Sequence, residues 1–132
     1  MSTDEERRAR GLDVYSHLFG TAPEHVPAAM AERVGAVFAE EAFLGYGGPG
    51  WHSPGLSPRD RSIAVLAAMV SQGVRADRLS GHLQMAVDNG LDEDALSALM
   101  ILLALYAGVA RASLAMETVH DLFTSGPRTT KA

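Results

Sequence analysis

The chain has 132 residues and no cysteine, which excludes disulfides, thiolate nucleophiles and cysteine-ligated metal sites. Eleven basic and sixteen acidic residues give a formal net charge of −5, and no basic cluster stands out, so neither nucleic acid nor an anionic membrane is an expected partner. A single domain over residues 1–132 is expected at this length, and the charged first ten residues predict a cytoplasmic protein without a signal peptide.

The first predicted helix begins at a capping box, in which Thr3 is followed three residues later by Glu6. It ends at Phe19, because Gly20 suits the left-handed conformation that closes many helices. Its inward-facing side is predicted to contain Leu12, Val14 or Tyr15, and Leu18 with Phe19.

A turn over residues 21–27 precedes a second predicted helix, which covers about residues 28–43. One side of this helix is expected to be apolar and to contain Met30, Val34, Val37 and Phe38. The next segment, residues 45–55, is so rich in glycine and proline that no helix is expected there.

Segment 45–55 holds the single tryptophan of the chain, Trp51, together with His52 and Tyr46. Long irregular loops in compact domains often carry function, so these three side chains are candidates to line a substrate pocket. Equally, a large aromatic side chain such as Trp51 can fill a core while the glycines turn the chain. The sequence leaves both interpretations open.

Two further helices are predicted after this segment. Ser57 as N-cap and Pro58 at the first helical position begin a helix that ends at Gly73. The next helix covers residues 76–89 and ends at Gly90. The apolar sides of the two helices contain Ile63, Leu66, Ala67 and Val70 in the first, and Leu79, Leu83 and Ala86 in the second.

A long apolar helix is predicted after Asp92, a suitable N-cap, and Gly108 interrupts or bends it. It has two apolar stripes: one contains Leu96, Leu99, Met100, Leu103 and Ala107, and the other Ala95, Ala98, Leu102, Leu105 and Val109. The run is too short for a membrane span, so both stripes must be covered by protein. We expect the chain's own helices to cover one stripe and a second copy of the chain to cover the other.

A last helix is predicted over residues 110–123. Residues 1–3 and the polar tail, residues 124–132, are expected to be frayed. The complete prediction is an all-α fold of six helical stretches with short connections.

His82 lies at the edge of the apolar stripe of helix 76–89, so its ring is expected to be partly buried. Because the unperturbed pKa of histidine is near neutrality, His82 is a candidate general acid or base. Arg78, one turn earlier on the same side, is expected to lower that pKa and is able to hold a substrate carboxylate. The alternatives are a structural histidine bonded to a carbonyl and an arginine that extends into water.

No metal site is expected. Glu117 and His120 have a three-residue spacing that occurs in carboxylate-bridged metal helices, but no partner motif accompanies them. The sequence also lacks a phosphate-binding glycine loop preceded by a strand and a Gly-x-Ser-x-Gly nucleophile motif.

Short motifs occur in a recognisable order along the chain, and together they cover roughly residues 11–123. They are Arg10-Gly11-Leu12, Phe19-Gly20, Trp51, Pro54-Gly55-Leu56-Ser57, Arg59-x-Arg61-Ser62, His82-Leu83, Ala86, Asn89-Gly90 and Tyr106-Ala107-Gly108. This order resembles the carboxymuconolactone decarboxylase family. The resemblance implies the all-helical fold of the alkyl hydroperoxidase D superfamily and assembly as a homotrimer or homohexamer.

The resemblance also implies a chemistry. A chain without cysteine cannot use the Cys-x-x-Cys pair of the superfamily's peroxidase branch, whereas the decarboxylase branch removes carbon dioxide from a small unsaturated lactone acid without a cofactor. By resemblance, His82 occupies the position of the family's pocket histidine. The family usually carries a glutamate four residues earlier and an arginine before Pro-Gly-Leu, where this chain has Arg78 and Ser53.

We therefore predict a lyase, free of cofactor and metal, for a small cyclic carboxylated or enolisable metabolite, with His82 as the proton-transferring residue. Arg78, Trp51, His52 and Tyr46 are predicted to bind the substrate. Decarboxylation and a related isomerisation, cyclisation or elimination are all compatible with these residues. The alternative is a non-catalytic small-molecule-binding or assembly protein on the same fold.

Overall fold

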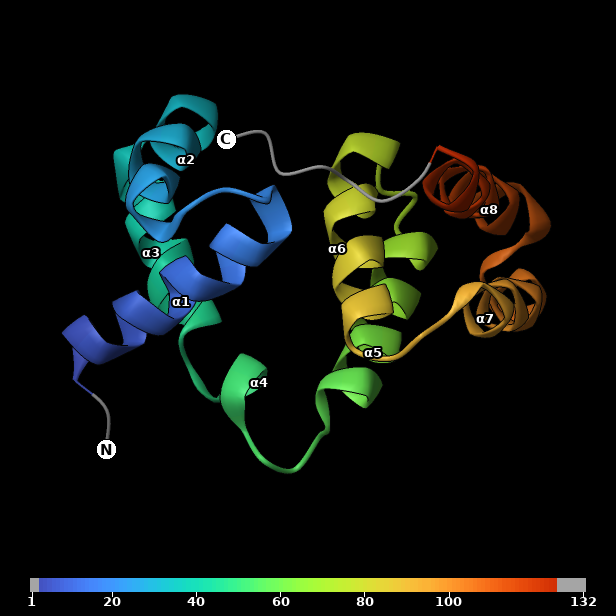
Figure 1. Cartoon of the computed structure of the whole chain (residues 1–132), viewed down its shortest axis with the longest axis horizontal. Coiled ribbons are helices and arrows are strands. Elements are labelled where there is room, and N and C mark those ends of the chain that lie inside the picture. The colour runs from blue at the N-terminus through green and yellow to red at the C-terminus, as the bar shows by residue number, and fades with distance from the viewer. Residues whose placement is uncertain (1–2, 126–132) are drawn as a thin grey trace. The chain divides into compact units, whose positions relative to one another are not determined.

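The computed structural model describes residues 3–125, and every regular element among these residues is helical. The all-α prediction is therefore confirmed. The elements are α1 (Asp4–Phe19), the 3₁₀-helix η1 (Pro23–His25), α2 (Val26–Val34), α3 (Ala36–Tyr46), α4 (Pro49–His52), α5 (Pro58–Ser71), α6 (Ala76–Asp88), α7 (Glu93–Ala107) and α8 (Val109–Thr124) (Figure 1).

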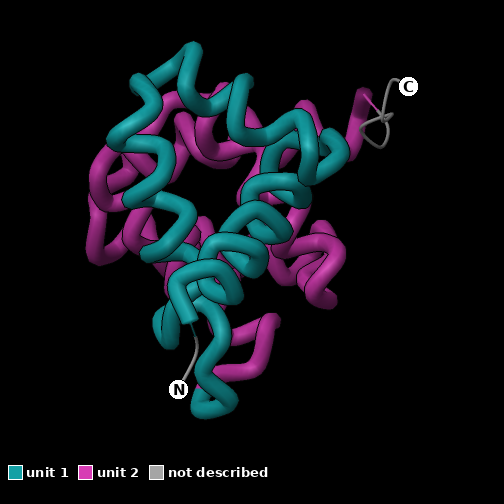
Figure 2. Tube along the Cα trace, turned by 90° about the vertical axis from the view of Figure 1, so that its left-hand side faces the viewer, with its two compact units in different colours: residues 1–55 teal, residues 56–132 magenta. Residues whose placement is uncertain are grey.

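The helices form two compact units along the chain (Figure 2). Unit 1 is residues 1–55 and contains α1 to α4, whereas unit 2 is residues 56–132 and contains α5 to α8. The expected single domain over the whole chain stays a prediction. Of the ends expected to be frayed, residues 1–2 and 126–132 lie outside the described residues, whereas Thr3 caps α1 and Thr124 ends α8.

Unit 1 is organised by the packing of α1 against α3. Both predicted ends of α1 are confirmed: the Thr3 hydroxyl accepts a hydrogen bond from the Glu6 backbone N–H at 3.1 Å, and Gly20 is left-handed with φ 67°. Val14, Tyr15 and Leu18 are buried, whereas the predicted Leu12 and Phe19 are half-buried.

The predicted helix over residues 28–43 is two helices, because Gly35 adopts φ 85° and breaks it. The break changes which side of the second half faces inward, so α3 buries Ala39 and Phe43. Val37 and Phe38, which were expected on the buried side, are 82% and 62% exposed. The prediction failed because apolar periodicity does not reveal a change of helix direction at a glycine.

The expectation that no helix occurs in segment 45–55 is also wrong. Helix α3 continues to Tyr46, and the single turn α4 begins at Pro49, after two intervening residues. Proline is tolerated at the start of α4 because the first N–H groups of a helix have no intrahelical partner.

Two backbone contacts hold α1 against the end of α3. A Cβ atom added to Gly11 would lie 1.9 Å from the Phe43 carbonyl oxygen, and one added to Gly47 would lie 1.6 Å from the Arg7 carbonyl oxygen. Glycine at these two positions therefore lets the backbones approach more closely than any side chain permits.

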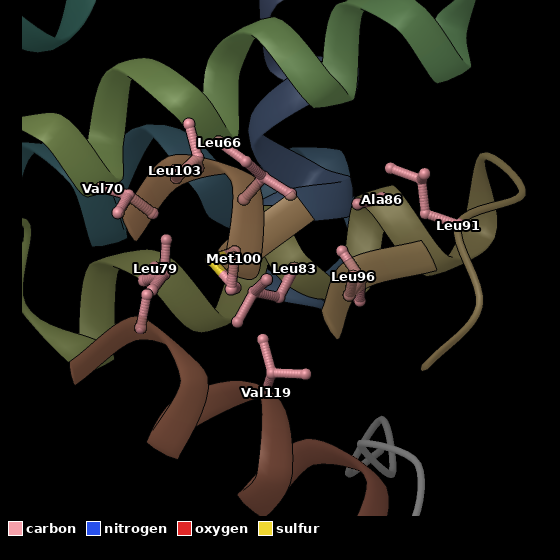
Figure 3. Packing of buried hydrophobic residues seen from close by; sticks show 11 residues of the cluster. Leu66, Val70, Leu79, Leu83, Ala86, Leu91, Leu96, Met100, Leu103 and Val119 are labelled. Carbon is pink, nitrogen blue, oxygen red and sulfur yellow. The ribbon is translucent and has the colours of Figure 1, made fainter. Parts of the chain in front are cut away.

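Unit 2 forms around α6, which packs against α5 and α8, while α7 packs against α5 and α8. The predicted N-caps are confirmed: Ser57 accepts from the Asp60 N–H at 3.1 Å, and Asp92 accepts from the Ala95 N–H at 2.9 Å. In the core, Leu83, Met100 and Val119 point toward one another from α6, α7 and α8 (Figure 3).

Helix α7 has one buried and one exposed apolar side within unit 2. Leu96, Met100 and Leu103 of the first predicted stripe are buried. Leu102, Leu105 and Val109 of the second are 52–79% exposed. Among the described residues, no helix combines the length and apolarity needed to cross a membrane.

Substituting Gly11 with alanine is expected to destabilise the fold by about 1–3 kcal/mol or more, since the new methyl group must displace the α3 backbone. Gly45→Ala is the matched control, because Gly45 lies on α3 with no neighbouring atom within 4 Å and alanine favours the helix. Urea denaturation followed by circular dichroism measures both variants. Equal midpoints for Gly11→Ala and the parent chain would contradict the close contact.

Candidate functional site

His82 lies on α6 beside the buried side chains of Leu79, Leu83 and Ala86, and it is half-buried as predicted. Burial lowers the pKa of His82 below its ordinary value of 6.5, because removing the ring from water disfavours the charged imidazolium. At neutral pH the imidazole is therefore predominantly neutral and able to accept a proton.

Arg78 lies one helical turn before His82 and is exposed. The charge of Arg78 was expected to lower the pKa of His82, but the cause of the lowered pKa is burial of the His82 ring. Nearby, Arg75 and Asp77 form an exposed ion pair at 2.9 Å, and Arg78 is not part of it. A role for Arg78 in holding a substrate carboxylate stays a prediction.

In unit 1, Tyr46 and Trp51 belong to an aromatic stack. The ring centroids of Tyr46 and Trp51 are 5.3 Å apart with nearly parallel planes, and Tyr46 stacks on Tyr15 at 4.8 Å. Tyr15 in turn meets Phe43 edge-on. These contacts support the packing interpretation of Trp51, whose ring is half-buried. Ligand binding by Tyr46 and Trp51 stays a prediction.

His52 is exposed at the end of α4, and its Nε2 atom lies 3.0 Å from the carbonyl oxygen of Tyr46. This contact orients the imidazole relative to the aromatic stack. His52 also lines a hollow of about 640 Å³ in unit 1. The other lining residues are Arg7, Arg10, Gly47, Gly48, Pro49, Ser53 and Pro54.

Sequence reasoning missed Arg7 and Arg10 on the wall of this hollow. Arg10 donates from Nε to the Gly47 carbonyl at 3.0 Å, and Arg7 has a buried Nε atom. A signal was present, since Arg7 precedes the buried residues Gly11 and Tyr15 at intervals of four. Such a spacing places all three on one side of a helix. The prediction of the inward-facing side of this helix considered only apolar residues, so it did not include Arg7.

Unit 2 contains a second hollow, of about 630 Å³, between α7 and α8. Its lining is mainly apolar and includes Met100 and Met116. It also includes Val109, which belongs to the second predicted apolar stripe. Glu117 and His120, the pair considered for a metal, also line it. Among residues 3–125, no group of three histidine or carboxylate side chains is arranged to hold a metal ion.

Comparison with known proteins identifies a family. The model of the carboxymuconolactone decarboxylase family matches residues 39–121. The chain belongs to the carboxymuconolactone decarboxylase family. A 4-carboxymuconolactone decarboxylase of Acinetobacter baylyi is 30% identical over 122 residues, which cover 91% of this chain and 89% of that relative. No solved structure matches the chain.

All the predicted site residues of this family member lie within the matched region, whereas Arg7 and Arg10 precede it. Tyr46, Trp51 and His52 belong to unit 1, where the structure brings them together around α4. Arg78 and His82 belong to unit 2, one turn apart on α6. Substrate binding by these residues stays a prediction.

The lowered pKa of His82 makes the folded state sensitive to acid. As the pH falls through about 6.5, the unfolded chain takes up a proton at this residue before the folded chain does, so the free energy of unfolding decreases until the folded pKa is reached. We expect His82→Gln to reduce this loss, measured by urea denaturation at about pH 7.5 and about pH 5.5. The control His120→Gln should keep it, and an unchanged pH dependence in His82→Gln would contradict the assignment.

Proposed function

We propose that this chain is a cofactor-independent lyase that decarboxylates a small cyclic carboxylic acid. Family membership supports a decarboxylase-like enzyme, and a relative named 4-carboxymuconolactone decarboxylase aligns along nearly the whole chain. The observation that carries the proposal is His82, a half-buried imidazole with a lowered pKa beside the buried residues of α6. Such a group can exchange a proton with a substrate near neutral pH.

In the proposed reaction, the bond between the ring carbon and the substrate carboxylate breaks and carbon dioxide leaves. The electron pair of that bond passes to the conjugated carbonyl of the substrate, so no cofactor is needed to hold it. His82 then delivers a proton to a carbon of the resulting enolate, which restores the carbonyl. Because the imidazole is neutral at rest, it takes up this proton when the anionic substrate arrives and stabilises its charged form.

The remaining predicted residues are proposed to bind the substrate. The guanidinium of Arg78, on the same side of α6 as His82, has the planar donor geometry that matches a carboxylate. Tyr46 and Trp51 offer stacked aromatic rings, and His52 adds a polar edge. The same residues suit a related isomerisation, cyclisation or elimination of an enolisable metabolite in specialised metabolism.

A second candidate function is non-catalytic binding of a small molecule. The identity of residue 78 favours this function. Related decarboxylases are expected to carry a glutamate four residues before the pocket histidine, and this chain has Arg78 there. A protein with this function would bind the carboxylated compound and leave it unchanged.

Replacing His82 with glutamine is expected to lower the turnover of 4-carboxymuconolactone at least about 100-fold, because general acid–base catalysis is lost. Carbon dioxide release measures turnover, and His120→Gln on α8 serves as a control that removes an exposed histidine. Undiminished turnover in His82→Gln would exclude His82 from the mechanism. Binding without turnover in the parent chain would favour the second candidate function.

We also propose that copies of the chain assemble through the outer side of α7, as a homotrimer or homohexamer. Ile101, Leu105 and Tyr106 are 71–84% exposed there, and Val109 at the start of α8 extends the same apolar surface. A surface of this kind is costly in water and is typical of protein–protein interfaces.

Leu105→Glu is expected to convert the assembly into smaller species at micromolar concentration, because a buried unpaired carboxylate disfavours the interface. Sedimentation velocity measures the species present. Leu56→Glu is the control, since Leu56 is 49% exposed outside α7 and α8. A parent chain that sediments as a folded single copy would contradict the proposal.

A further inference from the structure

We propose that the hollow of unit 1 binds the carboxylate group of a small organic molecule through Arg7 and Arg10. The lining residues include these two arginines and His52 but no acidic residue, although the whole chain has a net charge of −5. The hollow therefore has the charge that attracts an anion. The proposal rests on the proposed function only for the choice of a carboxylate as the ligand.

The first observation that supports carboxylate binding concerns Arg7. Its Nε atom is buried, and among residues 3–125 no protein group accepts a hydrogen bond from it. The Nε atom is enclosed by protein, so a ligand in the hollow would be bound by the terminal nitrogens of this guanidinium, one of which lies beside Gly48 of the hollow. The next residue, Arg8, shows the contrast: its Nε donates to Glu40 at 2.8 Å. One arginine of this helix is therefore neutralised by the protein, and the other faces a hollow without an acid.

The second observation that supports carboxylate binding concerns Arg10. Its Nε donates to the Gly47 carbonyl at 3.0 Å, which fixes the plane of the guanidinium. Its two terminal nitrogens make no hydrogen bond with the described part of the chain. Terminal guanidinium nitrogens in a fixed plane match the two oxygens of a carboxylate.

Gly48 makes room for Arg7 in this arrangement. A Cβ atom at Gly48 would lie 2.4 Å from the Arg7 terminal nitrogen Nη2, so a side chain at this position would displace the guanidinium. Gly50, two residues later on α4, has no atom within 4 Å of an added Cβ. The glycine that touches Arg7 therefore has a steric role that its neighbour lacks.

The volume of the hollow favours an organic carboxylate over inorganic phosphate, whose oxygens have the same hydrogen-bonding chemistry. About 640 Å³ lies within the range of pockets that enclose whole small molecules. A bare phosphate ion would occupy only a small part of it.

Binding can be measured without turnover. Trp51 is the only tryptophan of the chain and lies beside His52 on α4, so its fluorescence reports on the hollow. We expect a saturable change on titration with benzoate, and weaker binding or none with inorganic phosphate. Arg7→Gln and Arg10→Gln should each weaken benzoate binding at least about tenfold, as loss of a charged hydrogen bond does.

Arg8→Gln is the matched control, because it removes the same charge from the same helix outside the hollow and should leave the affinity unchanged. Gly48→Ala should also weaken binding while preserving every charge, whereas Gly50→Ala should not. Circular dichroism verifies folding, and the Gly48 and Gly50 pair keeps the test decisive if Arg10→Gln is unstable.

Equal affinities for Arg7→Gln, Arg8→Gln and the parent chain would overturn the proposal, and so would phosphate binding as tightly as benzoate. Failure of the proposed function gives a different result. A parent chain that never releases carbon dioxide but loses benzoate on Arg7→Gln would keep the binding site and remove the reaction. If the parent chain shows full turnover and Arg7→Gln leaves the affinity for benzoate unchanged, the reaction is kept and the binding site is removed.

Discussion

The close approach of the α1 backbone to the end of α3 is the constraint on which unit 1 depends. Gly11 meets the Phe43 carbonyl, and four residues away on each segment Gly47 meets the Arg7 carbonyl. These two contacts fix how α1 lies against α3. They also place the Arg7 and Arg10 side chains beside residues 47–54. The positive wall of the hollow thus follows from backbone contacts that leave no room for a side chain.

Unit 2 is held together in a different way, by large buried apolar side chains. Leu83 and Leu96 are fully buried, and α6 is held between α5 and α8. Burial is also what changes the chemistry of His82, because the same packing that stabilises α6 removes part of its ring from water. In this unit the core that holds the helix also sets the protonation state of its histidine.

The sequence predicted the parts of the fold that depend on local chemistry. Thr3, Ser57 and Asp92 cap helices as expected, since a short polar side chain before an apolar run has one favourable arrangement. It did not reveal the break at Gly35, because both halves of the broken helix keep an apolar periodicity. The direction of α3 is set by packing, so the exposure of Val37 could not be read from its spacing.

The candidate site was predictable to a similar degree. The half-burial of His82 followed from its place beside an apolar stripe, and the family was recognisable from the order of motifs. The wall formed by Arg7 and Arg10 was not predicted, because it depends on residues nearly forty positions apart in the sequence. Contacts of that range are visible only when the backbones that bring them together are known.

The aromatic stack has a consequence for how the two units unfold. Trp51, Tyr46 and Tyr15 all lie in unit 1, whereas unit 2 has the exposed Tyr106 and no tryptophan. Tryptophan emission therefore follows the loss of structure in unit 1 alone, while far-ultraviolet ellipticity follows the helices of both units. Coincident transitions would mark one cooperative folding unit, and separate transitions would mark two.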